Sequence, residues 1–269
     1  MELFARELGQ GAPVVIMHGL YGSSDNWLTV GRMLAEKYRV ILVDLRNHGQ
    51  SPSSSVHTYQ AMSNDLLELF NRLNLSEAML VGHSMGGKVA MQFTYNNPTR
   101  VSSLVVADIL PYNYINDEAK GYGEARQHAK IISALLALKP ELAESRGELD
   151  KKLAQTIPSK AVRQFLLKNV KRNSMGRFEW QLNVPVIGEN IELLMGAVLP
   201  VGGDAPITVK TLFIKGQNSN YVFSEGVSKL GQFFTNFDVK TIPNAGHWLH
   251  AENPEAVINE MLQFWNPLS

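Results

Sequence analysis

Short apolar runs, many of them β-branched, alternate along the chain with longer stretches in which apolar residues recur every three or four positions. The short runs predict buried strands, and the longer periodic stretches predict amphipathic helices. Strands are predicted at residues 14–17, 40–43, 79–81, 104–107, 212–214 and 239–242. Because the helical stretches between them act as crossover connections, we expect an α/β fold with a mostly parallel central sheet flanked by helices.

This alternation stops between residues 111 and 206, where no convincing core strand is found. Helical patterns occupy residues 118–138, 141–155 and 160–168, and shorter apolar segments follow at 178–180 and 191–195. We interpret residues 111–206 as a helical cap inserted before the penultimate strand, with residues 1–110 and 207–269 as the core domain. An ordinary set of surface helices is the alternative interpretation.

A serine stands at the junction of a predicted strand and a predicted helix. The sequence Gly-His-Ser-Met-Gly, residues 82–86, directly follows the apolar run at 78–81 and precedes a helical stretch that begins at Gly87. Glycines on both sides of Ser84 permit a turn so sharp that a β-carbon would collide there. The pattern predicts a nucleophile elbow that exposes the Ser84 hydroxyl, whereas a structural loop serine is the alternative.

A serine nucleophile needs a base, and the chain has seven histidines. His247 is the candidate, because it lies in a Gly-His loop after the last predicted strand and neutral imidazole can accept a proton near pH 7. His250, three residues further on, is the alternative base. Surface or supporting roles are expected for His48, His57, His83 and His128.

The loop after the first predicted strand contains Gly19 and Gly22 and can bring a backbone amide to the substrate. We predict that the N–H groups of Leu20 and Met85 form a two-donor oxyanion hole. His18 is expected to brace this loop by hydrogen bonding rather than to transfer protons.

The order of these features resembles the α/β-hydrolase superfamily, and most closely the small YbfF-type bacterial esterases. The resemblance extends from about residue 14 to residue 265. It is carried by His18-Gly19, Asp-Leu-Arg-Asn-His-Gly-Gln-Ser at 44–51, Gly-His-Ser-Met-Gly-Gly-Lys at 82–88, Asp108, Gly-Gln-Asn-Ser-Asn-Tyr-Val at 216–222 and Gly246-His247. We expect a single catalytic unit that carries an insertion, with its working residues at the carboxyl ends of the strands of the parallel sheet.

The acid partner of the histidine departs from the commonest superfamily pattern. That pattern has a carboxylate in the loop after the strand that precedes the histidine strand, where this chain has Asn218 and Ser219 and no acid. Either side chain could orient an imidazole, but neither can balance its positive charge. Asp108 follows the predicted strand at 104–107 and resembles the acid of the YbfF-type esterases, so we predict that Asp108 is the acid.

Three other aspartates are rivals for this role. Asp44 is expected to fix the turn at residues 46–51 instead, and Asp204 belongs to the cap junction. Asp238 begins its strand and so lies at the wrong end of it.

Composition restricts the partners. The 25 basic and 25 acidic residues give a formal net charge of zero, so nothing indicates binding to nucleic acid or anionic lipid. The absence of cysteine excludes disulfides, thiolate metal sites and a cysteine nucleophile. Metal-binding, phosphate-loop and dinucleotide spacings are missing, and we predict no metal and no cofactor.

The beginning of the sequence lacks the pattern of a signal peptide, and no apolar run approaches the ~20 residues of a membrane span. We therefore expect a cytoplasmic protein with no membrane partner, whose oligomeric state the sequence does not determine.

These features together predict a serine esterase that hydrolyses carboxylic esters or acyl thioesters through a Ser-His-Asp triad and an acyl-enzyme. A carbon–carbon bond hydrolase or lyase on the same triad is an alternative, as is a low-turnover ligand receptor of hydrolase fold. Cap residues that either line an acyl pocket or form ordinary core are Phe165, Leu166, Phe178, Trp180, Leu193, Leu194 and Met195.

Overall fold

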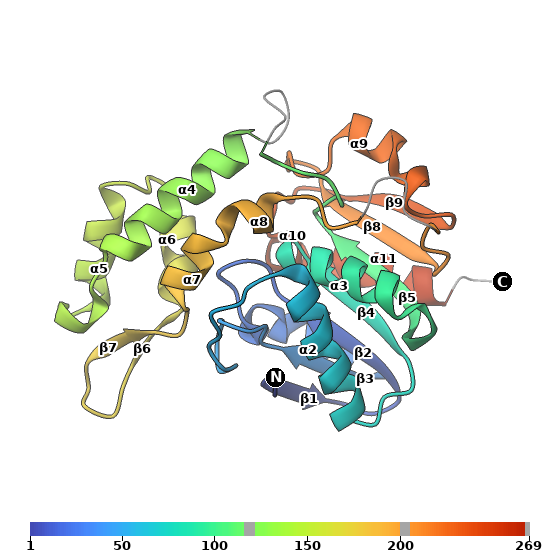
Figure 1. Ribbon diagram of the computed structural model, residues 1–269, viewed down its shortest axis with the longest axis horizontal. Helices are drawn as coiled ribbons and strands as arrows, with labels where there is room; N and C mark the ends of the chain where they lie inside the picture. The colour runs from blue at the N-terminus through green and yellow to red at the C-terminus, as the bar shows by residue number, and fades with distance from the viewer. Residues whose placement is uncertain (116–121, 200–204, 267–269) are drawn as a thin grey trace.

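The central element of the computed structural model, which describes residues 1–115, 122–199 and 205–266, is a seven-stranded sheet (Figure 1). Its strand order is β1-β3-β2-β4-β5-β8-β9. The strands are β1 (Ala5–Leu8), β2 (Ala12–Met17), β3 (Tyr38–Val43), β4 (Ala78–His83), β5 (Val101–Ala107), β8 (Thr211–Gly216) and β9 (Phe237–Ile242). All neighbours pair in parallel except β1 and β3, so the predicted α/β-hydrolase fold is confirmed.

Each predicted strand is present, and β1 is an antiparallel edge strand that the sequence pattern did not predict. Successive residues of the strands alternate between two apolar clusters, one on each face of the sheet. Val15 and Met17 of β2 belong to one cluster, and Val14 and Ile16 belong to the other. This period of two is the reason why a continuous apolar run can be buried on both faces.

Helices cover both faces of the sheet. The face that carries Val15 is covered by α2 (Tyr59–Arg72) and α3 (Met85–Asn96). The opposite face is covered by α1 (Leu28–Leu34) and α11 (Pro254–Trp265). Two short helices, α9 (Ser224–Ser228) and α10 (Leu249–Glu252), follow β8 and β9 in the chain, and short 3-10 turns occur at η1 (Ser24–Trp27), η2 (Pro98–Arg100) and η4 (Leu230–Gln232).

The segment between β5 and β8 contains a run of elements that do not belong to the central sheet, and we call residues 111–206 the insertion (Figure 1). Its elements are α4 (Tyr122–Ala137), η3 (Pro140–Leu142), α5 (Arg146–Ala154), α6 (Lys160–Leu167), β6 (Val170–Arg172), β7 (Phe178–Trp180), α7 (Val184–Glu189) and α8 (Ile191–Met195). The predicted helices at 118–138, 141–155 and 160–168 correspond to α4, α5 and α6, with residues 118–121 outside the described residues. The short antiparallel pair β6 and β7 was not predicted.

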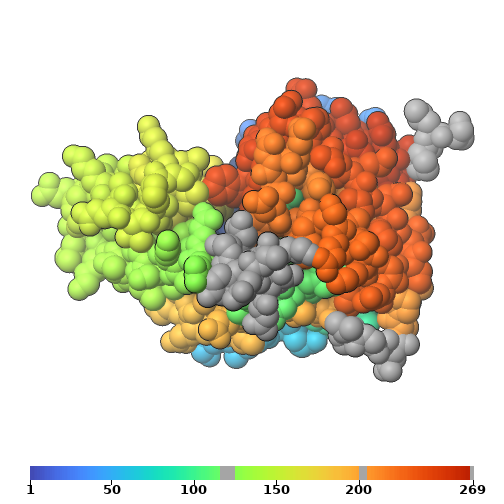
Figure 2. Space-filling model, turned by 90° about the horizontal axis from the view of Figure 1, so that it is seen from above, coloured from blue at the N-terminus to red at the C-terminus, as the bar shows by residue number. Residues whose placement is uncertain are grey.

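The insertion lies beside the carboxyl edge of the sheet, next to the C-terminal part of the core (Figures 1 and 2). The chain enters and leaves it through two adjacent segments that bond to each other. Tyr114 N–H donates to Met195 O at 2.8 Å, and Val198 N–H donates to Pro111 O at 3.0 Å. The division into a core domain and a cap domain stays a prediction.

Lys88 ties these two segments to the core. Its side chain starts one turn into α3 and donates hydrogen bonds to the carbonyl oxygens of Tyr112, at 3.0 Å, and Gly196. Burial lowers the pKa of Lys88 from 10.5 to about 7. A neutral amine retains two N–H donors, so both carbonyls keep a partner in either protonation state.

Candidate active site

Ser84 occupies the turn between β4 and α3, with φ 52° and ψ −118°. The turn is sterically closed: a β-carbon at Gly82 would lie 2.2 Å from Gly86 O, and one at Gly86 would lie 2.5 Å from His18 O. Ser84 N–H donates to Ala107 O at 2.9 Å, which attaches the turn to β5. The backbone therefore forms the tight strand-to-helix turn that the sequence predicts at residues 82–86.

His247 and Asp108 form a hydrogen-bonded pair. His247 Nδ1 lies 2.7 Å from Asp108 Oδ2, and the Asp108 side chain is completely buried. Because a carboxylate only accepts, Nδ1 carries the proton and Nε2 carries the lone pair. The His247 side chain is 24% exposed, which leaves the imidazole accessible.

Asp108 is fixed by groups from β8 and the loop that follows it. Gly216 N–H donates to Asp108 Oδ1 at 2.9 Å, and the Ser219 hydroxyl donates to Oδ2. Asp108 N–H donates to Ile214 O at 2.8 Å, and the residue has φ 53°. Ser219 thus supports the carboxylate rather than the imidazole, a contact between residues 111 positions apart that no local pattern reveals.

The loop after β2 is held by the side chain of His18. Its Nδ1–H donates to Gly19 O at 2.8 Å, and its Nε2 accepts from Leu45 N–H at 3.0 Å. Burial is the largest influence on the pKa of His18 and lowers it, which favours this neutral form. The expectation that His18 braces the loop is confirmed.

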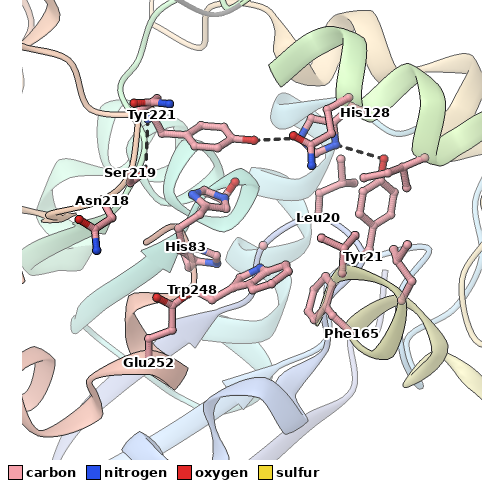
Figure 3. A pocket seen from close by; sticks show the side chains of 18 residues that line it. Leu20, Tyr21, His83, His128, Phe165, Asn218, Ser219, Tyr221, Trp248 and Glu252 are labelled. Carbon is pink, nitrogen blue, oxygen red and sulfur yellow. Dashed lines mark hydrogen bonds between the residues drawn. The ribbon is translucent and has the colours of Figure 1, made fainter. Parts of the chain in front are cut away.

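Three of the five residues predicted for the site line one cavity of about 320 Å³, which we call the large chamber (Figure 3). It is lined by residues of α4, α6, the loops after β2, β4 and β8, and the segment from His247 to Glu252. Leu20, Ser84 and His247 all line it. Met85 lines an adjacent cavity of about 20 Å³, the small chamber, which is formed mainly by residues of α2, α3 and α8.

The cap residues named from the sequence divide into two groups. Phe165 and Leu166 line the large chamber, whereas Leu194 and Met195 line the small chamber. Those that line neither are Phe178, Trp180 and Leu193. Phe178 is buried in the apolar cluster of the insertion and Leu193 is 59% exposed, so helical or strand spacing alone did not reveal which side faces the chambers.

The alternative base, His250, is buried against Trp27. The two rings are stacked with centroids 4.5 Å apart and an interplanar angle of 9°. Burial lowers the pKa of His250 to about 3. His250 does not line either chamber, so the geometry favours His247 as the base.

Of the other four histidines, His48, His57 and His83 are buried and His128 is half-buried, so of the surface or supporting roles expected for them the structure shows the supporting one. His48 Nε2 accepts from Tyr21 N–H at 3.3 Å, and His57 packs against the His48 ring. His83 Nε2–H donates to His247 O at 2.7 Å and so fixes the histidine loop. Their partners come from distant segments, which explains why sequence position did not indicate burial.

His128, on α4, links two sides of the large chamber (Figure 3). Its Nδ1 lies 3.2 Å from the Tyr21 hydroxyl, and its Nε2 lies 3.2 Å from the Tyr221 hydroxyl. The Tyr221 ring stacks on His247 with centroids 3.9 Å apart. Burial lowers the pKa of His128 to about 4, so the bridging imidazole is neutral at pH 7. The sequence did not identify this bridge.

Of the rival acids, Asp44 fixes the turn after β3, as expected. Its carboxylate accepts from Ser24 N–H at 2.6 Å and from Gln50 N–H at 2.8 Å. Asp238 lies at the beginning of β9, far from the carboxyl edge. Asp204 lies outside the described residues.

Within the described parts of the chain, no group of three or more histidine, aspartate or glutamate residues is arranged to hold a metal ion. No helix in residues 1–115, 122–199 or 205–266 has the length and apolar character needed to cross a bilayer. The cytoplasmic location stays a prediction.

The sequence pattern of the α/β hydrolase fold matches residues 12–254, and the chain belongs to this family. Esterase YbfF of Escherichia coli (strain K12) is 34% identical over 262 residues, which cover 97% of this chain and 96% of that protein. The sn-1-specific diacylglycerol lipase ABHD11 of Danio rerio is 34% identical over 96% of this chain and 80% of its own length. A solved structure described as a marine microorganism esterase is 39% identical and superposes with a TM-score of 0.93, covering 98% of this chain and 99% of that one. The resemblance to YbfF-type esterases is confirmed.

Proposed function

We propose that this chain is a serine hydrolase that cleaves carboxylic esters, or acyl thioesters, through an acyl-enzyme formed on Ser84. Its membership of the α/β-hydrolase family and its similarity to esterases and a lipase support ester hydrolysis. One observation carries the assignment of residues. His247, joined at 2.7 Å to the buried Asp108, lines the same cavity as a serine in a strained turn.

In the proposed reaction, His247 Nε2 removes the proton from the Ser84 hydroxyl as Oγ attacks the acyl carbonyl carbon. The resulting imidazolium is stabilised by Asp108, which also holds the proton on Nδ1. His247 then protonates the leaving oxygen or sulfur as its bond to the acyl carbon breaks. Water, activated by His247, releases the acid from Ser84 and regenerates the enzyme.

The negative charge of the tetrahedral intermediate is assigned to the N–H groups of Leu20 and Met85. Met85 is the first residue of α3, and N–H groups in the first turn of a helix have no acceptor within the helix. The N-terminus of α3 also favours negative charge at this point. Leu20 is positioned by the loop that His18 braces, whose Gly19 O accepts from Gly22 N–H at 3.0 Å.

The insertion acts in this proposal as a cap that excludes water from the acyl group. Its residues His128, Phe165 and Leu166 form the wall of the large chamber opposite the sheet edge. A cap that encloses the reacting groups strengthens their electrostatic interactions and selects substrates by shape.

The test is active-site labelling combined with turnover. The wild type should react once with a fluorophosphonate probe and hydrolyse p-nitrophenyl esters and acyl thioesters over many turnovers. Ser84→Ala should lose both labelling and turnover, with a fall on the order of 10⁶ in kcat, because the change removes one oxygen atom and little packing. Retention of a few percent of the activity by Ser84→Ala would exclude the acyl-enzyme, and labelling without turnover would indicate a receptor.

A further inference from the structure

The two chambers meet at Ser84 and differ greatly in size. The large chamber has a volume of about 320 Å³ and the small chamber about 20 Å³. Their shared lining consists of Leu20, Ser84, His128 and Tyr221. His128 and Tyr221 are joined by a hydrogen bond and line both chambers, so this pair lies at the boundary between them. A substrate held at Ser84 must therefore place its acyl chain and its leaving group in spaces of unequal size.

The proposed chemistry decides which substituent enters which chamber. The leaving oxygen or sulfur must lie beside the imidazole that protonates it. His247 lines the large chamber and does not line the small one. The leaving group therefore extends into the large chamber, and the acyl chain points away from His247, past Met85 into the small chamber.

The size of the small chamber limits the acyl chain. The small chamber, with a volume of about 20 Å³, is little larger than the 10–15 Å³ that a single water molecule needs. It therefore holds one or two carbon atoms beyond the carbonyl. The apolar side chains of Ile109, Leu194 and Met195 line it, which suits an alkyl group.

The walls of the small chamber are tied to the core and resist expansion. The Tyr59 hydroxyl, from α2, donates to Leu194 O at 2.5 Å, and Lys88, from α3, donates to Gly196 O. These bonds hold the end of α8 against the core helices on both sides of Met195. Displacing α8 to admit a longer chain would leave buried polar groups without partners, which is costly.

The large chamber offers a different lining. Phe165 packs against Trp248 with ring centroids 5.1 Å apart, and Ile131 and Val162 add further apolar surface. Polar side chains of Gln127, Asn218 and Asn220 line it as well. This combination suits a leaving group with an apolar body and hydrogen-bonding substituents.

We infer that the natural substrate is a short-acyl ester or thioester, of about two or three acyl carbons, with a bulky alcohol or thiol as its leaving group. This inference rests on the proposed function, because it uses His247 to orient the substrate. A preference for short acyl groups distinguishes this site from one that selects long-chain acyl groups.

The first experiment varies one substituent at a time on the wild-type protein. With p-nitrophenol as the constant leaving group, kcat/KM should fall at least tenfold from acetate to octanoate. With acetate as the constant acyl group, kcat/KM should hold or rise from the methyl to the benzyl to the 2-naphthylmethyl ester, a series in which every leaving group is a primary alcohol of similar acidity. An octanoate that is hydrolysed as well as acetate would overturn the inference.

The second experiment exchanges the chamber walls. Met195→Ala enlarges the small chamber and should raise the octanoate-to-acetate ratio of kcat/KM at least tenfold, since one methylene in an apolar pocket is worth about tenfold or more. Phe165→Ala is the matched control, because it enlarges the large chamber and should change the dependence on the alcohol but not the acyl ratio. The reverse pattern would mean that the chambers are assigned the wrong way round.

Two further variants keep the test decisive. If Met195→Ala does not fold, Ile109→Val removes a single methyl group from the same chamber and should shift the butyrate-to-acetate ratio about threefold in the same direction. Ser84→Ala separates the two proposals. Turnover that survives in Ser84→Ala contradicts the proposed function, whereas an inactive Ser84→Ala with a flat acyl-length profile in the wild type contradicts only the inference about substrate.

Discussion

The sheet edge and the insertion contribute to the same cavity by different means. At the sheet edge, the backbone places the groups: Ser84 N–H bonds to Ala107 O, and Asp108 N–H bonds to Ile214 O. At the insertion, side chains form the wall, as with His128 between two tyrosine hydroxyls and Phe165 against Trp248. Groups placed by the backbone keep their positions when neighbouring side chains change. Walls made of side chains change shape with every substitution.

This difference indicates that the sheet edge supports the reaction chemistry and that the insertion decides selectivity. Reaction chemistry depends on distances of a few tenths of an ångström, which strands and their glycine-dependent turns can hold. Selectivity depends on the volume and polarity of the cavity, which a few side chains decide. Substitutions at the sheet edge should therefore change rates by orders of magnitude, and substitutions in the insertion should mainly change which substrate is preferred.

The largest effect is expected for His247→Ala, which should lower kcat on the order of 10⁶, as for the serine variant. His250→Ala is the control. It removes the ring stacked on Trp27 and should lower stability, yet turnover per folded molecule should stay within tenfold of the wild type. Measuring kcat together with thermal unfolding separates the two effects. Equal losses of turnover in both variants would contradict the assignment of the base.

Asp108→Asn should lower kcat by about 10⁴, because an amide cannot balance the imidazolium and favours the wrong tautomer. Asp44→Asn is the matched change, since Asp44 is also a buried carboxylate that accepts from backbone N–H groups, but it does not bond to His247. It should act through stability. A normal kcat in Asp108→Asn, together with loss of turnover in Asp44→Asn, would assign the role of the acid to Asp44 instead.

At the boundary between the two regions, His128→Phe removes both hydrogen bonds to Tyr21 and Tyr221 while keeping a ring. We expect kcat/KM to fall roughly tenfold, because one or two hydrogen bonds of about 1 kcal/mol each are lost at the site. His128→Gln can bond to one or both hydroxyls and should recover part of the activity. A purely space-filling role would instead make the Phe variant the better of the two.

The smallest effect on turnover is expected at the junction of the insertion with the core, where the predicted effect is on stability. The pKa of Lys88 in the folded protein is lowered from 10.5 to about 7, so between pH 7 and about 10.5 the unfolded chain holds a proton that the folded chain lacks. The contribution of Lys88 to the free energy of unfolding therefore rises with pH in that window, by up to about 1.4 kcal/mol per pH unit. The same contribution is lost as the pH falls toward 7.

Lys88→Met should abolish this dependence and leave Tyr112 O and Gly196 O without the Lys88 donor. The difference in free energy of unfolding between wild type and variant should consequently grow from pH 7 to pH 10. Urea unfolding at each pH measures it. A difference that stays constant with pH would contradict the lowered pKa.

The two regions also differed in how far the sequence could predict them. Strands of the core were predicted from their apolar runs, but β1 was missed because its sequence, Ala-Arg-Glu-Leu, is short, half polar and on the edge of the sheet. The proposed triad residues were named from the elbow motif, the Gly-His loop and, for Asp108, the resemblance, and each lies after a strand, where parallel strands bring their carboxyl ends together. In the insertion, periodicity identified helices but not the faces that line the chambers, so Leu193 was named although it is exposed.

The Asp108–His247 pair was the one contact between distant side chains that we predicted, because the resemblance indicated it, and other such contacts were missed. Ser219 on Asp108 and His128 between the two tyrosines join segments that are about 90 to 110 residues apart. Such pairs depend on the final packing of loops and helices rather than on local pattern. They are also the contacts that complete the site.

The backbone of Ser84, with φ 52° and ψ −118°, lies outside the region that residues with a side chain usually adopt. A conformation of this kind costs about 1–3 kcal/mol, a substantial part of the 5–15 kcal/mol by which a typical domain is stable. Glycine would relieve that strain, and it would also remove the hydroxyl. Selection of this protein for thermal stability alone would therefore favour loss of its nucleophile. Any engineering of the protein for stability must for this reason also select for turnover.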